Sequence, residues 1–449
     1  MMTAEELKYV QKLEVTVAEQ DKLISELKEH IAELERRLNM NSTNSSTPPS
    51  KDGFKRPKKR SLRQPSEKKP GGQAGHKGNG LSLPHDPDEV IICQPKECAG
   101  CPNASVCVGR KAERRYVIDA EVSLRVREYA QMEFSCPRRN GDNLYGEFPE
   151  NITATKQYGN TLKALVVALN TEGAVSVKRT HDILCALTGV PVSTGFIHNT
   201  LRAFANGLEK PLEYIKGKLL NAPVLHADET GLRVDGSLAW LHSASNELYT
   251  YQGVSNRRGK QGIAEVGLLP LYTGTLIHDC WAAYWSLAAK CHGICLAHIL
   301  RELNGIIENF TEHNWAEGLK TLLMEMKEAK DKLIAKGKTE ASRYYIRKFK
   351  EDWDLWIWSG QHHNPIEEAE DTGRTKRNKA RCLVDRLKKY EEAVWLFFRD
   401  FSVPFDNNQA ERDVRPAKTK MKVSGSFVTV QPQEKIFHNQ AGNCNFNVE

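Results

Sequence analysis

The chain has 449 residues and a mass of 50.7 kDa, which exceeds one ordinary hydrophobic core and predicts about two to four domains. No apolar run reaches the roughly 18 residues of a membrane span, and the start MMTAEELKYV lacks a signal peptide's apolar stretch, so we expect a cytoplasmic protein without membrane contact. The net charge is +7, and the eleven cysteines, an odd number with several in one short window, favour reduced thiols or metal ligands over a disulfide framework.

Residues 1–42 have the period of a coiled-coil zipper. The seam places Val10, Val17, Ile24, Ile31 and Leu38 at a positions and Leu13, Gln20, Leu27 and Leu34 at d positions. This pattern favours a parallel homodimer, or a higher assembly, with Gln20 as a polar residue that sets the register. The alternative is an amphipathic helix that folds onto the chain's own body.

Residues 43–80 form a basic linker. The segment 51–69 holds nine Lys or Arg against Asp52 and Glu67, an excess of +7 that equals the charge of the whole chain. Such a tether predicts contacts with nucleic-acid phosphates. The candidate DNA-binding residues are Lys55, Arg56, Lys58, Lys59 and Arg60. A solvated linker without a ligand is the other interpretation. The PGGQAGHKG element that follows lacks the spacing of a phosphate-binding loop.

Residues 81–150 are rich in cysteine and predict a small zinc-finger-like domain. Cys98 and Cys101 have the spacing of a zinc knuckle, and Cys107 and Cys136 complete the candidate ligand set for a structural Zn²⁺. Cys93 competes for one of the four places, and no second tight pair is present. The other interpretation is a domain whose cysteines hold no metal.

Residues 151–221 predict a helical domain. The run from Val175 contains one helix, a Gly-Val-Pro turn and a second helix that Ser193 or Thr194 caps. This is a helix-turn-helix pattern, which is also common in helical domains that do not contact DNA.

Residues 222–427 change to strands. The predicted elements are APVLHADE, SLAWLHSAS, ELYTYQ, a helix near GIAEVGLLPLY, TLIHDC, a helix WAAYWSLAAK, a strand GICLAHI, a helical insertion at about 299–402, and a last helix that Asp406 or Asn407 caps and Pro416 limits. The order β-β-β-α-β-α-β is that of a ribonuclease H-like core. The fold class is therefore multidomain α+β.

Three acidic residues stand on separate elements of this core. Asp228 lies on the first strand, Asp279 at the end of the fourth, which is its neighbour in this topology, and Glu411 in the first turns of the last helix. Converging carboxylates from separate elements are typical of a site for hard divalent cations. Each acid alone has a plainer interpretation as a surface or capping residue.

The motifs in chain order resemble a known family. The zipper, PGGQAGHKG, the cysteine cluster, HADETG, HDCWAAY, CLAHILREL and DNNQAERDVRPAKTKMKVSGSF closely resemble the insertion-sequence sixty-six family of bacterial DDE transposases, over roughly residues 1–427. The resemblance implies that Asp228, Asp279 and Glu411 are the catalytic triad. It also implies element-end and target DNA as partners, accessory transposition proteins as further candidates, two Mg²⁺ ions (or Mn²⁺) and a zinc-finger-like segment.

The implied chemistry is two-metal phosphodiester hydrolysis followed by transesterification. Two ions between the three carboxylates would activate a water against the phosphodiester at the element end, and the freed 3′ hydroxyl would then attack the target DNA. Around this site, Arg301 and Arg415 are candidate phosphate contacts. His226 and His278 are predicted to pack, with hydrogen bonds to the proposed ligands as the alternative. Cys295 and His298 are predicted to pack or to lie near DNA rather than to bind metal, and the basic segment 374–389 to be solvated or to face DNA.

The tail 428–449 departs from the family pattern and is typical of a frameshift. We hypothesise that the last core helix lost a packing partner there. Two other functions therefore stay open. One is a transposase-derived DNA-binding protein that is catalytically inactive because of its altered C-terminus, and the other is a general metal-dependent nuclease.

Overall fold

The computed structural model describes residues 4–41, 43–45, 86–91, 93, 102, 113–118, 122–135, 143–309, 314–368 and 375–427. Several sequence predictions fall outside these residues and stay predictions. They concern the basic residues Lys55, Arg56, Lys58, Lys59 and Arg60, the zinc candidates Cys98, Cys101, Cys107 and Cys136, and the tail 428–449.

The chain divides into two compact units. The larger comprises residues 1–60, 158–182 and 192–449, and the smaller comprises residues 61–157 and 183–191. In the smaller unit, β1 (Glu133–Ser135) pairs antiparallel with β2 (Asn143–Tyr145). The Tyr145 hydroxyl donates to Glu133 Oε1 at 2.7 Å, which ties the two strands together through side chains as well.

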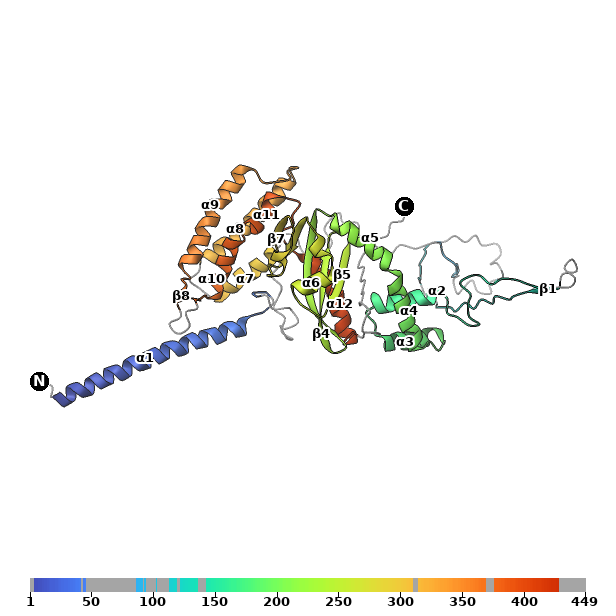
Figure 1. Ribbon diagram of the computed structural model, residues 1–449, viewed down its shortest axis with the longest axis horizontal. Helices are drawn as coiled ribbons and strands as arrows, with labels where there is room; N and C mark the ends of the chain where they lie inside the picture. Colours follow the sequence, from blue (N-terminus) through green and yellow to red (C-terminus); the bar gives the residue numbers. More distant parts are fainter. Residues whose placement is uncertain are drawn as a thin grey trace. The chain divides into compact units, whose positions relative to one another are not determined.

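The described helices match most of the helical predictions (Figure 1). They are α1 (Ala4–Asn39), α2 (Asn160–Thr171), α3 (Val177–Thr188), α4 (Thr194–Gly207), α5 (Glu209–Leu220), α6 (Lys260–Val266), α7 (Leu296–Asn309), α8 (Asn314–Ile334), α9 (Arg343–His362), α10 (Lys379–Lys389), α11 (Glu391–Arg399) and α12 (Asn408–Ser424). At α4 the predicted cap is confirmed, since the Ser193 hydroxyl accepts from the Phe196 N–H at 3.1 Å.

A five-stranded mixed sheet lies at the centre of the larger unit. Its strands are β3 (Val224–Val234), β4 (Ser237–Ser245), β5 (Thr250–Ser255), β6 (Thr275–His278) and β7 (Cys291–Ile294), in the spatial order β5-β4-β3-β6-β7. The pairs β3–β4 and β4–β5 are antiparallel, whereas β3–β6 and β6–β7 are parallel. A further short pair joins β8 (Glu367–Glu368) to β9 (Thr375–Lys376). The predicted strands thus form one sheet with β3 in its middle.

Helices cover both faces of this sheet (Figure 1). Gln252 of β5 donates to the Asp413 carbonyl of α12 at 2.8 Å, and the next residue, Gly253, contacts Val266 of α6. Because successive strand residues point to opposite faces, α12 and α6 lie on opposite sides of the sheet. One face therefore carries His226 and Asp228 of β3 beneath α12, and the other face carries apolar residues beneath α6.

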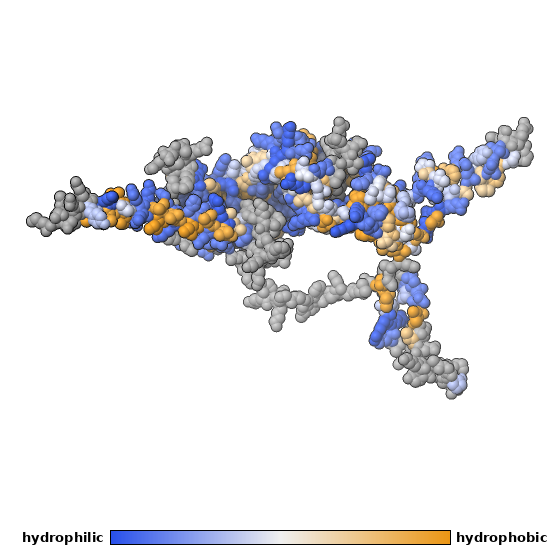
Figure 2. All heavy atoms as spheres, turned by 90° about the horizontal axis from the view of Figure 1, so that it is seen from below, coloured by the Kyte–Doolittle hydropathy of each residue, from blue (hydrophilic) through white to orange (hydrophobic). Residues whose placement is uncertain are grey.

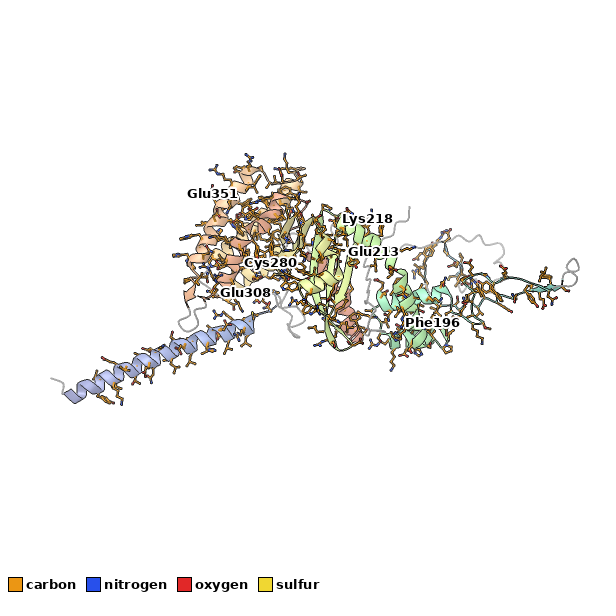
Figure 3. The ribbon with its side chains drawn as sticks, viewed as in Figure 1. Phe196, Glu213, Lys218, Cys280, Glu308 and Glu351 are labelled. Carbon is orange, nitrogen blue, oxygen red and sulfur yellow. The ribbon has the colours of Figure 1, made fainter. Side chains whose placement is uncertain are left out.

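Helices α7 to α11 pack against one another. Three fully buried tryptophans lie among them, namely Trp315, Trp353 and Trp395. The rings of Trp353 and Trp395 meet edge to face at 5.9 Å, a favoured aromatic geometry. Helix α11 packs on β7 and joins this group to the sheet. The predicted helical insertion thus shares one hydrophobic core with Ile277 of β6 and Ile294 of β7. After α1, Asn44 donates to Glu308 of α7 at 2.8 Å (Glu308 is labelled in Figure 3).

Three element predictions need correction. The segment WAAYWSLAAK forms only a 3₁₀ turn, Tyr284–Ser286, because Cys280 takes a left-handed φ of 73° and the Asp279 carboxylate accepts the Trp281 N–H at 3.0 Å. Strand β7 ends at Ile294, and α7 begins at Leu296. Pro416 does not limit α12, which continues to Ser424. Proline has no N–H, so the Arg412 carbonyl lacks its helical donor, but Arg412 is exposed and water can satisfy that carbonyl.

The zipper seam is uncovered in the single chain. Its apolar residues on α1 range from 37% exposed at Val10 to 84% at Leu38. Figure 2 shows them as a hydrophobic stripe along this helix.

None of the described helices combines the length and the apolar run that a bilayer crossing needs.

Candidate functional site

Asp228 occupies the middle strand of the sheet. On β3 it stands opposite Ser243 of β4, and its Oδ1 accepts the Glu229 N–H at 2.9 Å. The pairing of β3 with β6 stops at His226 and Ile277. Asp228 therefore lies just past the last paired residues of two parallel strands, where the sheet opens.

Asp279 follows β6 directly and reaches the same opening. Parallel neighbours end at the same edge of a sheet, so Asp228 and Asp279 lie at one end of the β3–β6 pair. Cys280, the next residue, is labelled in Figure 3 beside the sheet. The Asp279–Trp281 hydrogen bond fixes the turn that carries this acid.

Burial and neighbouring charges change the pKa of both aspartates. Burial raises the pKa of Asp228 well above its ordinary value, and the charges of Glu229, Asp279 and Glu411 raise it further. Burial also raises the pKa of Asp279, again reinforced by Glu229. The structure thus gathers Asp228, Asp279 and Glu411 closely enough for their like charges to repel.

Glu411 comes to this cluster on the first turn of α12. Asn407, at the start of that helix, donates from Nδ2 to the Ala227 carbonyl at 2.8 Å, and its Oδ1 lies 2.8 Å from His226 Nδ1. The sequence analysis offered Asn407 as a cap of this helix, but its side chain does not cap it. The side chain instead joins the start of the helix to β3. Asp406 takes part of the capping role, since its Oδ1 accepts the Asn408 N–H at 3.0 Å.

Arg301 is an ion-pair partner of Glu411, at 3.3 Å. The other predicted phosphate contact, Arg415, is exposed on α12. In the predicted basic segment 374–389, Arg381 and Arg386 are bound within the protein, to Asp385 and to Glu302. Arg301 therefore lies beside Glu411, and Arg386, although paired with Glu302, is close enough for its charge to act on Cys280 and His298.

Cys295, His298 and Glu411 form a second group with ligand chemistry, whose atoms lie within 4.8 Å of one another. Burial raises the pKa of the Cys295 thiol to about 12, and its sulfur accepts the Asn407 N–H at 3.2 Å. Arg301 adds a positive charge at the same place. Because Arg301 already pairs with Glu411 and the Cys295 sulfur already accepts the Asn407 N–H, we interpret Cys295 and His298 as packing residues that support the start of α12.

Three further residues, Glu229, Arg258 and Tyr284, lie near Asp279, and the sequence analysis missed all of them. Glu229 is 3% exposed at its side chain and accepts hydrogen bonds from the Tyr284 hydroxyl at 2.6 Å and from Arg258 Nη2 at 2.9 Å. Arg258 lies over the rings of Trp240 and Trp281, at 4.4 and 4.6 Å. The acidic pair HADE was a signal for Glu229, but nothing local points to Arg258.

The chemistry of the cluster fits a hard divalent cation. Asp228, Asp279, Glu229 and Glu411 bring four negative charges, whereas Arg258 and Arg301 bring two positive ones, which leaves a net charge of −2. Carboxylate oxygens are the ligands that Mg²⁺ and Mn²⁺ prefer. Asp228, Asp279 and Glu411 are the residues that would hold the metal, because both Glu229 oxygens already have protein partners.

A mixed α/β domain with acidic side chains gathered at the open end of its central strands belongs to the class of structures that support metal-assisted phosphate chemistry. The model of the family described as Transposase IS66 family matches residues 155–434, more than half of the chain. The chain belongs to this family, and the predicted resemblance is confirmed. Membership implies DNA binding and the use of a divalent metal.

A second family model, described as a family of unknown function (DUF6444), matches residues 4–82. A search among curated proteins gives no match. The transposase match ends at residue 434, seven residues past Phe427, where the sequence analysis placed the end of the resemblance. The family match therefore does not favour the other interpretation, a transposase-derived DNA-binding protein that is inactive because of its altered C-terminus.

Proposed function

We propose that this protein is the transposase of a bacterial insertion sequence, with a ribonuclease H-like core that cleaves DNA at the element ends and joins them to target DNA. The observation that carries the proposal is the convergence of Asp228, Asp279 and Glu411 from β3, from the end of β6 and from α12. The strand order β5-β4-β3-β6-β7 supports the choice of core.

In this proposal each of the three acids is a metal ligand. A bound pair of divalent cations supplies Lewis-acid stabilisation of the phosphate oxygens and lowers the pKa of an attacking water. Asp228 and Asp279 contribute from the rigid sheet, and Glu411 contributes from a helix that Asn407 fastens to β3. Burial strengthens the interaction of Asp228 and Asp279 with a cation, because water screens them little.

Other parts of the chain serve DNA binding and assembly in this proposal. The basic linker and Arg415 contact phosphates, α1 pairs with a second copy, and the cysteine-rich segment holds a structural Zn²⁺. Accessory transposition proteins are further proposed partners. Cleavage at both ends of an element requires two active sites, which a zipper dimer supplies.

The test is a strand-transfer assay with full-length protein, Mg²⁺ and DNA that carries the element's own ends. We expect joined product from the wild type and none from Asp228→Asn or Glu411→Gln. Asp413→Asn is the matched control, because Asp413 lies on the same helix and its carboxylate bonds only Gln409 among the described residues.

The outcomes separate the remaining functions. Cleavage without end specificity or joining would favour a general nuclease. DNA binding that persists without any product, and that Asp228→Asn leaves unchanged, would favour a binding protein and contradict the proposal.

A further inference from the structure

Arg258 is held unusually firmly for a half-exposed arginine. Its side chain is 48% exposed, yet its guanidinium contacts two indole rings and binds the buried carboxylate of Glu229. Glu229 is itself fixed by the hydroxyl of Tyr284, a fully buried residue. The charge is therefore pre-positioned and loses little conformational freedom when it binds a ligand.

The local backbone explains how Arg258 reaches this place. Gly259 has φ +87°, which a residue with a side chain adopts only under strain, and it lets the chain turn sharply into α6. Trp281, which supplies one of the two rings, is two residues after Asp279, and its backbone N–H donates to the Asp279 carboxylate. Arg258 therefore lies at the open end of the β3–β6 pair, beside the proposed catalytic acids.

The guanidinium also has unused donors. Arginine carries five N–H groups, and among the described residues only Glu229 accepts a hydrogen bond from Arg258. The side chain is 48% exposed, at a place where like-charged carboxylates would otherwise repel a DNA phosphate.

We propose that Arg258 is a phosphate-binding residue of the active site, whose free N–H groups bind a phosphodiester of the DNA strand that reaches Asp228 and Asp279. Arginine suits this role because its planar fork matches two phosphate oxygens. The inference rests on the proposed function in one respect, namely that the ligand is DNA.

The test measures binding rather than turnover. Full-length protein is titrated against a fluorescent duplex that carries an element end, with Ca²⁺ in place of Mg²⁺, in a series of salt concentrations. A second series replaces single phosphates near the end by neutral methylphosphonates. The proteins are the wild type, Arg258→Gln, Arg258→Lys and Arg257→Gln.

Arg257 is the matched control. It precedes Arg258, is also exposed, and binds Gln261 and Glu265 instead of lying over the tryptophans. We expect Arg258→Gln to reduce affinity by about tenfold or more and to lower the log-log salt slope by about 0.9, the contribution of one phosphate. Arg257→Gln should leave the slope unchanged, and Arg258→Lys should keep the slope but lose affinity.

The methylphosphonate series is decisive. One substitution should weaken the wild type, and the same substitution should have no further effect on Arg258→Gln, as expected for two groups that contact each other. Equal losses in both proteins at every position would overturn the inference, as would equal slopes for Arg258→Gln and the wild type.

Two controls keep the result interpretable. Melting temperatures show whether each variant is folded, and Arg258→Lys retains the charge beside Glu229 if Arg258→Gln proves unstable. If the protein cleaves and joins DNA but every methylphosphonate weakens the wild type and Arg258→Gln equally, only this inference is refuted. Coupling of Arg258 to one phosphate without any strand transfer would refute only the proposed function.

Discussion

Burial and the neighbouring negative charges both raise the pKa of Asp228, so the stability of the protein depends on pH. Because its folded-state pKa lies well above 3.8, the folded protein binds more protons than the unfolded chain between these two values. Stability therefore falls as the pH rises through this window and stays reduced at neutral pH. The acid cluster destabilises the protein when no cation is bound.

Asp228→Asn should accordingly stabilise the metal-free protein. At pH 7 in EDTA we expect the free energy of unfolding to rise by about 1 to 3 kcal/mol, within the larger single-residue effects. The gain should disappear below pH 3.8, where both states of the wild type are protonated. Thermal melts over a pH series measure this, and added Mg²⁺ should raise the melting temperature of the wild type more than that of the variant. An Asp228→Asn protein that melts lower than the wild type in EDTA would contradict the prediction.

The sequence could place the acids of the site but not the residues that hold them. Asp228 and Asp279 end β-rich runs, and such runs predict their strands without knowledge of the fold. Glu229, Arg258 and Tyr284 meet only through tertiary packing, so no spacing along the chain joins them. Asn407 is a local capping residue by pattern, and a long-range contact with His226 and Ala227 overrides that preference.

At the scale of elements, α12 decides where Glu411 lies. Its C-terminal half is fixed by Lys420, whose buried ammonium donates to both oxygens of Asn170 and to the Val175 carbonyl, at 2.6 to 3.0 Å. Phe427 then pairs with the end of β3. Its N–H donates to the Arg233 carbonyl, and its carbonyl accepts the Asp235 N–H. All these contacts are made by residues before 428. The helix α12 therefore has packing partners that do not depend on the tail 428–449, which the sequence hypothesis did not consider.

Replacement of Lys420 by methionine tests this anchor. Lys420→Met should lower the free energy of unfolding by about 2 kcal/mol or more, because three buried oxygens lose a charged donor. Lys422→Met, an exposed neighbour on the same helix, should change it by less than about 0.5 kcal/mol. Urea denaturation measures both. Equal effects of the two variants would show that the ammonium is not an anchor.

The helical insertion offers a matched pair of glycines. A Cβ at Gly360 of α9 would stand 2.7 Å from Val384 and 3.0 Å from Trp315, whereas a Cβ at Gly217 of α5 would meet nothing within 4 Å. Gly360→Ala should destabilise the protein by about 1 to 3 kcal/mol through overpacking. Gly217→Ala should stabilise it by about 0.5 to 1 kcal/mol through helix propensity. Thermal and urea melts of both variants should therefore shift in opposite directions, and a stabilising Gly360→Ala would refute the packing argument.

Element prediction succeeded where periodicity was strong and failed at turns. The strands and long helices follow from alternation and from amphipathic spacing. The segment after Asp279 has helical composition, but the left-handed backbone at Cys280 and the Asp279–Trp281 bond are tertiary features that composition does not report. Pro416 was expected to limit a helix whose other contacts carry it through to Ser424.

For the whole molecule, the uncovered seam of α1 predicts self-association. Ile24→Asp combined with Ile31→Asp places two charges at a positions of the zipper, where burial against a partner would be costly. We expect the full-length wild type to sediment as a dimer or larger and the double variant to sediment as a monomer. Val15→Asp, an exposed position outside the seam, is the control and should retain the wild-type mass. Identical masses for the wild type and the double variant would exclude the zipper as the assembly element.

The three acids also impose an order in time. Asp228 and Asp279 leave the ribosome long before Glu411, which is 183 positions after Asp228 (411 − 228). A nascent or truncated chain that stops short of α12 lacks one of the three carboxylates and the Asn407 contact that seats it. If these acids form the proposed catalytic centre, an unfinished copy cannot cut DNA, because the centre exists only once the chain has been made and folded through α12.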